Sequence, residues 1–248
     1  MYHFFVDPDQ IGEKEIQITG KDVNHIKNVL RMQPGEEICI NSGQDNREYR
    51  CEIASLSEEE ICAKIMWVEE VGMELPNKIY LFQGLPKSDK MEWIIQKAVE
   101  LGVYEIVPVA TKRAVVKLDV KKEQNKRKRW QGISESAAKQ SKRTMIPQIH
   151  PVLTFEQAVE YARNLDVKLI PYELAEGMKK TRELFTGIGP GQSVAVFIGP
   201  EGGFDEQEVA FAMQCGVIPV TLGKRILRTE TAGMAVLSML VFCLEPEE

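Results

Sequence analysis

Apolar and polar residues alternate along four short segments near the start of the chain. These segments are rich in isoleucine and cysteine, and turn-forming residues separate them: 15–19, 36–42, 48–56 and 60–70. Alternation with a period of two is typical of half-buried β-strands. Between the first two segments, residues 21–32 carry apolar side chains at helical spacing. The pattern therefore predicts a small β-barrel with one short helix in this part of the chain.

After residue 77 the pattern changes to strands that alternate with longer helical segments. The expected strands are residues 78–84, 105–111, 167–173, 193–200 and 217–223, and the expected helices are 89–101, 122–143, 155–165, 205–216 and 231–244. Such alternation predicts a mostly parallel sheet with helices on both faces. We therefore expect an α/β protein with two domains, residues 1–72 and 73–248.

Residues that favour helix ends support several of these boundaries. Thr154 with Gln157, and Asp205 with Glu208, have the spacing of capping boxes. Ser88 is expected to cap the helix that follows it.

Composition changes this picture little, because 44% hydrophobic and 27% charged residues are ordinary for a globular protein. No run of eighteen apolar residues occurs and the first ten residues lack the pattern of a secretory signal, so we expect a cytoplasmic protein without a membrane span. Five cysteines without a CxxC pair indicate reduced thiols. The three histidines are far apart in sequence, and we expect no bound metal.

Charge is distributed unevenly along the chain, whose net charge is −6. Residues 1–72 hold 7 Lys and Arg against 15 Asp and Glu, whereas residues 112–143 hold 12 against 3. Like charges at helical spacing repel one another, so the basic segment 121–143 is costly unless something neutralises it. A solvated helix face is the simplest interpretation. We favour contact with RNA, because phosphates would offset the repulsion.

Two loops at the ends of predicted strands indicate ligand binding. Residues 199–203, Gly-Pro-Glu-Gly-Gly, follow an apolar strand, and glycines let backbone amides approach a ligand closely. Residues 222–231 place two arginines, a lysine, a glutamate and two threonines beside an apolar helix, although burial of polar groups is costly. An ordinary strand-to-helix turn is the alternative for the first loop. A solvated connection with Thr229 or Thr231 as the helix cap is the alternative for the second.

Six segments carry a resemblance that extends over nearly the whole chain. In order, they are HIKNVLRMQPGEEI (25–38), GLPKSDKMEWIIQKAVELGV (84–103), IVPVATKRAVVK (106–117), RWQGISESAAKQSKR (129–143), IGPEGGFDEQEV (198–209) and LGKRILRTETA (222–232). With these motifs the chain resembles the RsmE family of 16S rRNA (uracil-N3) methyltransferases, which belongs to the SPOUT superfamily. The resemblance implies an N-terminal PUA-like β-barrel and a C-terminal SPOUT α/β domain whose parallel sheet contains a trefoil knot. It also implies a homodimer.

The resemblance further implies S-adenosylmethionine as the cofactor, held in the knot largely by main-chain groups and apolar walls. Carried over residue by residue, the cofactor-binding residues would be Leu169, Pro171, Tyr172, Glu173, Ile198, Gly199, Pro200, Glu201, Gly202, Gly203, Leu222, Gly223, Ile226, Leu227, Arg228, Thr231 and Ala232.

The stretch 228–231, Arg-Thr-Glu-Thr, favours methylation of a base. Related SPOUT enzymes that methylate ribose 2′-oxygens carry a Ser-Leu-Asn signature at this motif. Removal of the proton from N3 of uracil leaves a negative charge that O2 and O4 share. We expect Arg228 to stabilise that charge, and Glu230 either to orient Arg228 or to accept the proton.

The partner that the resemblance implies is 16S rRNA, within the decoding region of the small ribosomal subunit. The residues expected to contact RNA are His3, Lys27, Arg31, Lys87, Arg113, Gln140 and Arg143. Members of the family often carry an arginine near residue 2 or 3. Here Tyr2 and His3 occupy that place, so His3 is the candidate substitute.

Two other functions are compatible with the sequence. A non-catalytic RNA-binding protein would use the barrel and the basic helix alone and would bind no S-adenosylmethionine. A SPOUT methyltransferase that acts on tRNA or on a different base would share the pocket and differ in its substrate.

Overall fold

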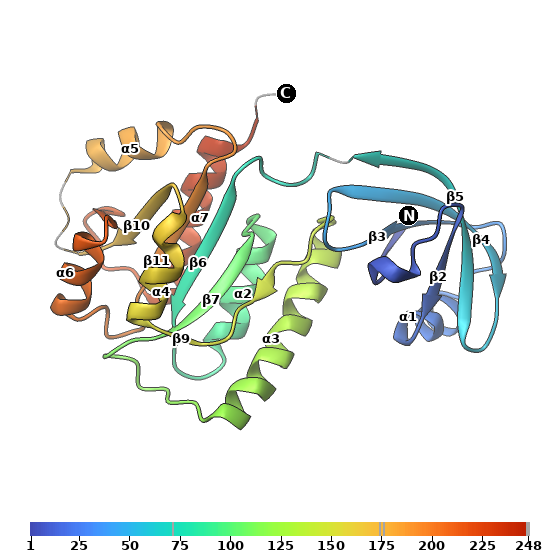
Figure 1. Cartoon of the computed structure of the whole chain (residues 1–248), viewed down its shortest axis with the longest axis horizontal. Helices are drawn as coiled ribbons and strands as arrows, with labels where there is room; N and C mark the ends of the chain where they lie inside the picture. The colour runs from blue at the N-terminus through green and yellow to red at the C-terminus, as the bar shows by residue number, and fades with distance from the viewer. Residues whose placement is uncertain (71, 174, 176, 247–248) are drawn as a thin grey trace. The chain divides into compact units, whose positions relative to one another are not determined.

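Figure 1 shows a computed structural model of the chain, which describes residues 1–70, 72–173, 175 and 177–246. Contacts within the chain divide it into two compact units. The first unit contains Met1–Glu74 and Ala138–Ile146, and the second contains Leu75–Ala137 and Pro147–Glu248. Each unit is built around its own cluster of buried apolar side chains.

The first unit is a five-stranded sheet in the order β1-β3-β4-β5-β2. Its strands are β1 (Tyr2–Phe5), β2 (Glu15–Thr19), β3 (Glu37–Asn41), β4 (Arg47–Leu56) and β5 (Glu60–Glu70). Two register shifts in the pairing of β4 with β5 bend these strands around the core, where Ile16, Ile18 and Ile61 are buried. The four expected strands are confirmed. β1, which pairs in parallel with β3, is an addition to them.

The helix expected over residues 21–32 is wrong in its length and regularity. A single α-helical turn, α1 (Lys21–Asn24), leads into a π-helical stretch, η2 (His25–Val29). Arg31 then leaves the helical region with a φ of 55°, and Met32 turns back into the core. The apolar residues of this segment still face the core, as the full burial of Ile26 shows. A short 3-10 turn, η1 (Pro8–Gln10), connects β1 to β2.

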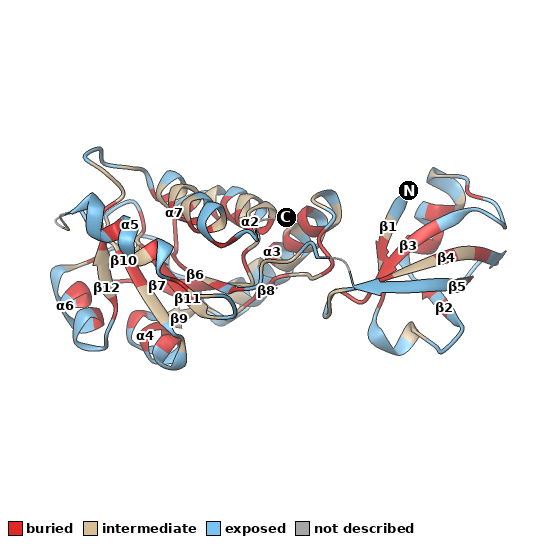
Figure 2. Ribbon diagram, turned by 90° about the horizontal axis from the view of Figure 1, so that it is seen from above, coloured by how far each residue is buried: buried red, intermediate tan, exposed pale blue. Residues whose placement is uncertain are grey.

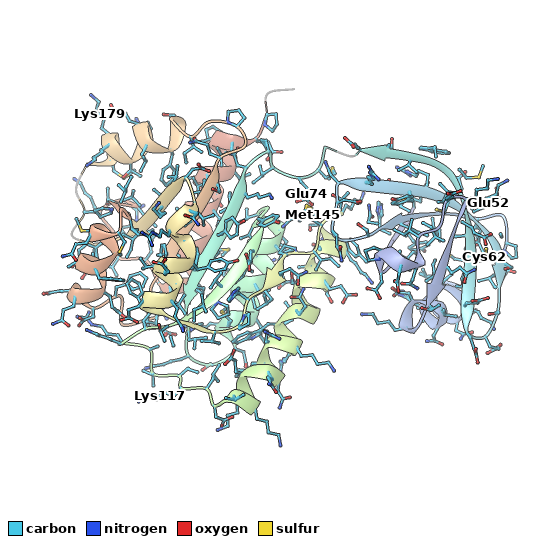
Figure 3. All side chains as sticks on the ribbon, viewed as in Figure 1. Glu52, Cys62, Glu74, Lys117, Met145 and Lys179 are labelled. Atoms are coloured by element: carbon cyan, nitrogen blue, oxygen red, sulfur yellow. The ribbon has the colours of Figure 1, made fainter. Side chains whose placement is uncertain are left out.

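Glu74 ties residues 138–146 to the first unit. Its carboxylate accepts hydrogen bonds from the backbone N–H groups of Thr144 and Met145, each at 3.1 Å. It also accepts one from Nε of Arg143 at 3.1 Å. Figure 3 labels Glu74 and Met145 next to each other in this unit. A carboxylate surrounded by donors in this way holds the segment firmly.

The second unit contains a seven-stranded sheet in the order β12-β10-β11-β6-β7-β8, with β9 also paired to β7. Its strands are β6 (Lys78–Gly84), β7 (Glu105–Ala110), β8 (Gln148–Ile149), β9 (Leu153–Thr154), β10 (Val167–Pro171), β11 (Ser193–Ile198) and β12 (Ile218–Val220). All of these pairings are parallel. Phe82 on β6 and Phe197 on β11 stack at the centre, with ring centroids 4.4 Å apart.

Helices cover both faces of this sheet. They are α2 (Lys90–Glu100), α3 (Val120–Gln140), α4 (Phe155–Tyr161), continued by η3 (Ala162–Asn164), α5 (Met178–Thr186), α6 (Glu206–Gln214) and α7 (Thr229–Leu244). Figure 2 shows α2 and α7 on one face of the sheet and α4 and α6 on the other. The expected α/β fold is confirmed. α5 was not expected, because only Thr181 and Phe185 of its residues are buried and the apolar pattern is weak.

No helix in the described part of the chain combines the length and the apolar character that a membrane span requires.

Two of the three expected helix caps are confirmed. Thr154 caps α4 and Asp205 caps α6, each in a complete capping box. The prediction that Ser88 caps α2 is wrong, because the helix begins after Asp89 and Ser88 itself has a φ of 57°. The chain therefore enters α2 through a left-handed turn, a conformation that non-glycine residues rarely adopt.

We expect Thr154→Ala to lower the free energy of unfolding by about 1 kcal/mol, because α4 loses the hydroxyl that accepts from the N–H of Gln157. Thr154→Ser keeps that hydroxyl and is the matched control. Urea unfolding of the two variants checks the prediction, and equal stability of both would contradict it.

Candidate active site

A cavity of about 470 Å³ lies at the carboxyl edge of the parallel sheet. Its walls come from the residues that follow β10, β11 and β12, and from α2 and the start of α7. The carboxyl ends of parallel strands are where open α/β sheets bind ligands. The volume lies in the range of small-molecule sites.

Most of the residues expected to bind a cofactor line this cavity. All of them do so except Leu169 and Thr231. Leu169 is fully buried within β10, and Thr231 lies in the first turn of α7. The two loops that the sequence singles out, residues 199–203 and 222–231, therefore face one another across a single space.

The glycine-rich loop is closely packed at Gly199 and against Gly84 of β6. A Cβ on Gly199 would lie 3.1 Å from the backbone of Gly203, and one on Gly84 would lie 2.7 Å from Pro200. Gly203 has a φ of 66° and donates its N–H to the carbonyl of Pro200 at 2.9 Å. Substitution of Gly199 or Gly84 would therefore crowd neighbouring backbone, and substitution of Gly203 would strain a left-handed conformation.

A buried hydrogen-bond network joins the two loops to the sheet. The hydroxyl of Thr229 donates to the carbonyl of Gly199 at 2.6 Å and accepts from Nε2 of Gln83 at 2.9 Å. Nε2 of Gln83 also donates to the carbonyl of Gly84 at 2.9 Å. Gln83 is fully buried at the end of β6. The network fixes the start of α7 against the glycine-rich loop.

Charged groups at the rim of the cavity form a second network. Nζ of Lys90 lies 3.1 Å from Glu201 and 3.3 Å from Glu230. The backbone N–H of Lys87 donates to both carboxylate oxygens of Glu201, at 3.1 and 3.3 Å. Hydrogen bonding to Glu201, and then to Glu230, raises the pKa of Lys90. Partial burial alone would raise the pKa of Glu201, but backbone hydrogen bonds and Lys90 lower it.

Two arginines also line the cavity. Arg113 donates to the carbonyl of Gly202 at 3.2 Å and lies 3.7 Å from Asp205. Arg228 immediately precedes α7. Its guanidinium forms no hydrogen bond or ion pair with the residues that the structure describes. None of its five donors is therefore occupied by a side chain or carbonyl of those residues.

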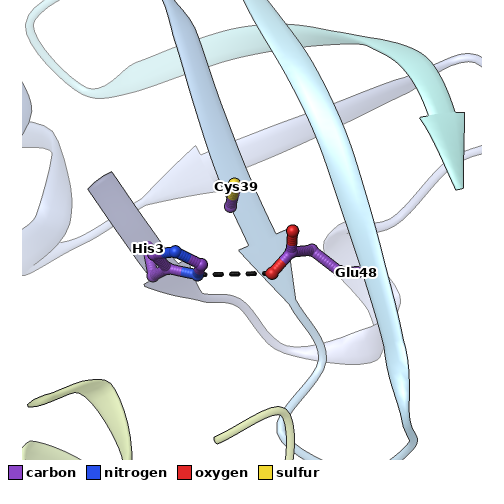
Figure 4. A group of neighbouring side chains, drawn as sticks. All are labelled: His3, Cys39 and Glu48. Carbon is purple, nitrogen blue, oxygen red and sulfur yellow. Dashed lines mark ion pairs between the residues drawn. The ribbon is translucent and has the colours of Figure 1, made fainter. Parts of the chain in front are cut away.

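His3 lies in the first unit, in a cluster with Cys39 and Glu48 (Figure 4). Its Nδ1 is 3.4 Å from Glu48, and burial is the main cause that lowers its pKa. The potential ligand atoms of the three residues lie within 4.8 Å of one another, as metal ligands would. However, Nε of Arg50 is 2.8 Å from Glu48, and burial raises the pKa of Cys39 to about 12. A guanidinium and a protonated thiol favour an ion-pair cluster over a cation site.

The other residues expected to contact RNA differ in their solvent exposure and in whether they form ion pairs within the protein. Lys27 forms an ion pair with Glu58, whereas Arg31 and Gln140 are exposed. Arg143 is only 7% exposed, and its guanidinium is paired with Glu74 within the first unit.

Basic residues of α3 are more accessible. The exposed ones at its start are Lys121, Lys122, Arg127, Lys128 and Arg129. Arg129 nevertheless has a partner in Glu92, at 2.8 Å. The basic charge of this helix therefore lies largely on an open surface.

Sequence reasoning missed Lys90, Gln83 and Thr229 as residues of the site. Gln83 had a signal, since a glutamine ends an otherwise apolar strand. Thr229 was expected as a helix cap or as part of stretch 228–231, but its buried hydrogen bonds to Gln83 and Gly199 were not expected. Lys90 had no local signal, because its partners lie more than a hundred residues away in sequence.

Two family models match the chain. A model described as an RNA methyltransferase domain matches residues 73–241, and one described as an RNA methyltransferase PUA domain matches residues 18–66. Among curated proteins, the chain is similar to ribosomal RNA small subunit methyltransferase E of Bacillus subtilis. The two are 39% identical over 252 residues, which cover 99% of this chain and 98% of that protein.

The chain is also similar to solved structures of methyltransferases. The fold is similar to that of a ribosomal RNA small subunit methyltransferase E from Neisseria gonorrhoeae bound to S-adenosyl methionine, with a TM-score of 0.83 and 32% identity. The match covers 96% of this chain and 95% of that one. A methyltransferase from Legionella pneumophila in complex with bound cofactor SAM also has a TM-score of 0.83 and 32% identity, with 96% of each chain covered.

We expect Thr229→Val to lower the free energy of unfolding by about 2 kcal/mol, because it keeps the shape of the side chain and leaves buried partners on Gly199 and Gln83 unpaired. Thr229→Ser keeps the hydroxyl and should lose less than half as much. Chemical unfolding measures both, and a loss below about 0.5 kcal/mol for the valine variant would show that the network contributes little.

Proposed function

We propose that this chain, which belongs to the ribosomal RNA small subunit methyltransferase E family, transfers a methyl group from S-adenosylmethionine to N3 of a uridine in 16S rRNA. The observation that carries the proposal is the cavity at the carboxyl edge of the sheet. It joins a glycine-rich loop that can hold a cofactor to an arginine without an ionic partner among the described residues. Both features are needed for transfer to a base nitrogen.

The cavity fits S-adenosylmethionine in size and chemistry. Loop 199–203 contains three glycines that line the cavity, so its backbone can approach a ligand closely. Pro171, Ile198, Leu222 and Leu227 supply apolar walls. The carboxylates at the rim suit a cofactor that carries positive charge. We therefore assign these loops to the cofactor.

When bound, S-adenosylmethionine supplies a methyl carbon on a sulfonium: the N3 lone pair forms the new N–C bond, and the electron pair of the C–S bond passes to the sulfur. Before this step, N3 of uracil must lose its proton. Arg228 is the group that stabilises the resulting anion, because its guanidinium lines the cavity and can donate to uracil oxygens.

Glu230 is the candidate acceptor of the N3 proton. Its side chain is 21% exposed and lies 3.3 Å from Lys90. Its Oε2 is buried, and it is this oxygen that faces the ammonium of Lys90. A carboxylate beside the cavity is a group that can serve as a general base. Orientation of Arg228 is the other role proposed for Glu230.

The RNA would be bound by basic and polar residues of both units. In the second unit, Arg113 lies at the cavity, Lys87 lies at the turn before α2, and the exposed basic face of α3 offers contacts to phosphates. In the first unit, which holds the PUA match, Arg31 and Gln140 are exposed. Since the target edge of uracil is used in base pairing, the nucleotide must be unpaired or flipped out.

Three further properties belong to the proposal. The substrate form is rRNA within the small ribosomal subunit, the protein is a homodimer, and the parallel sheet contains a trefoil knot. The name of the relatives supports rRNA of the small subunit. The homodimer and the knot are what the resemblance of the sequence motifs implies. A methyltransferase that acts on tRNA or on another base is the alternative, and it shares the same cavity.

Mass spectrometry of 16S rRNA tests the function directly. Deletion of the gene should remove one N3-methyluridine from the decoding region, and expression of the chain should restore it. Retention of that nucleoside in the deletion strain would refute the assignment. Calorimetry with S-adenosylmethionine addresses the non-catalytic alternative, which requires that no cofactor binds.

We expect Arg228→Ala to lower kcat about 100-fold or more, because one charge-stabilising donor group is removed from the transition state. The affinity for S-adenosylmethionine should stay within a few fold. Single-turnover methylation and calorimetry measure the two quantities. An equal loss of cofactor affinity would instead assign Arg228 to cofactor binding.

A further inference from the structure

We propose that Lys90 is a positioning residue that holds the carboxylates of Glu201 and Glu230 and so leaves Arg228 free for the substrate. This inference rests on the proposed function and deepens it. It gives a role to a residue that has no part in the mechanism above.

The contacts of Lys90 connect three elements of the site. Its Nζ, on the first residue of α2, lies 3.1 Å from Glu201 in the glycine-rich loop and 3.3 Å from Glu230 in the first turn of α7. The three side chains are between 21% and 30% exposed. An ammonium that is shared by two partly buried carboxylates is better ordered than an exposed surface pair.

The position of Lys90 is unfavourable for the helix itself. A helix N-terminus carries partial positive charge and prefers acidic residues, yet Lys90 is the first residue of α2. The turn that delivers it includes Ser88 with a φ of 57°, which costs conformational energy in a non-glycine residue. A lysine at a helix N-terminus and a serine with a positive φ are both locally unfavourable, and such features cluster at functional sites.

The same turn is anchored by its backbone. The N–H of Lys87 donates to both oxygens of Glu201, so that carboxylate is held from two directions. The raised pKa of Lys90 and the lowered pKa of Glu201 agree with a charged pair. Glu201 is therefore turned toward α2.

Arg228 is the cation that these carboxylates would otherwise neutralise. Glu201 and Arg228 line the same cavity, and Glu230 is two residues after Arg228 in sequence. With Lys90 in place, the guanidinium has no ionic partner among the residues that the structure describes. A carboxylate that paired with Arg228 would compete with the uracil anion for the same donors.

Four variants test whether Lys90 keeps Glu201 and Glu230 from pairing with Arg228. Lys90→Met removes the ammonium and keeps much of the stem, whereas Lys90→Arg keeps the charge. The double variant Lys90→Met with Glu201→Gln also removes one competing carboxylate. Lys97→Met, which breaks an ion pair with Glu100 elsewhere on α2, is the matched control.

We expect Lys90→Met to lower kcat by about ten-fold or more, with KM for RNA and the affinity for S-adenosylmethionine changed less than about three-fold. Lys90→Arg should restore most of kcat, and the double variant should recover at least part of it. Lys97→Met should match the unmodified protein. If Lys90→Met behaves like Lys97→Met, or if the double variant is worse than the single one, the inference is overturned.

A second measurement does not depend on turnover. Modification of Arg228 by phenylglyoxal, followed by mass spectrometry, reports whether its guanidinium is free. The rate should fall in Lys90→Met and recover in the double variant, and an unchanged rate would overturn the inference. This separates the two claims: a protein that transfers no methyl group to rRNA but shows this pattern would refute the proposed function alone.

Discussion

The site depends on a pair of buried polar side chains, Gln83 and Thr229. Their hydrogen bond, at 2.9 Å, joins the end of a central strand to the start of the last helix. Through its hydroxyl, Thr229 also holds the carbonyl of Gly199. Because a buried polar group without a partner is costly, each member of this network restricts the others. Two loops that are far apart in sequence are thereby kept at a fixed separation.

The two loops held by this hydrogen bond contribute different groups to the cavity. Loop 199–203 contributes main chain and little side chain, which suits recognition of a cofactor by shape. The loop after β12 contributes charge, with Arg228 at its end. At the rim of the cavity, the ammonium of Lys90 forms ion pairs with the carboxylates of Glu201 and Glu230. The glycine-rich loop also contributes one charge, Glu201, so the two loops are linked both by this carboxylate and by the hydrogen bond from Thr229 to Gly199.

The fold could be predicted from sequence largely because its signals are local. Alternation and capping boxes placed most strands and helices, and glycine and polar density marked the two loops. Signals that depend on distant partners failed. Nothing near Lys90 in sequence shows that Glu201 and Glu230 will pair with it, and nothing near Arg143 shows that it will be buried in a pair with Glu74. The break of the first helix at Arg31 likewise depends on how Met32 packs in the core.

The carboxylate of Glu74 has a consequence for how the protein could have been assembled in evolution. Because residues 138–146 belong to the first unit, the chain passes between the units three times. An RNA-binding module of this kind cannot be exchanged by recombination at a single junction. A replacement of residues 1–74 would have to bring an acceptor for the N–H groups of Thr144 and Met145, or leave those donors without their carboxylate. The two units are therefore expected to be inherited together.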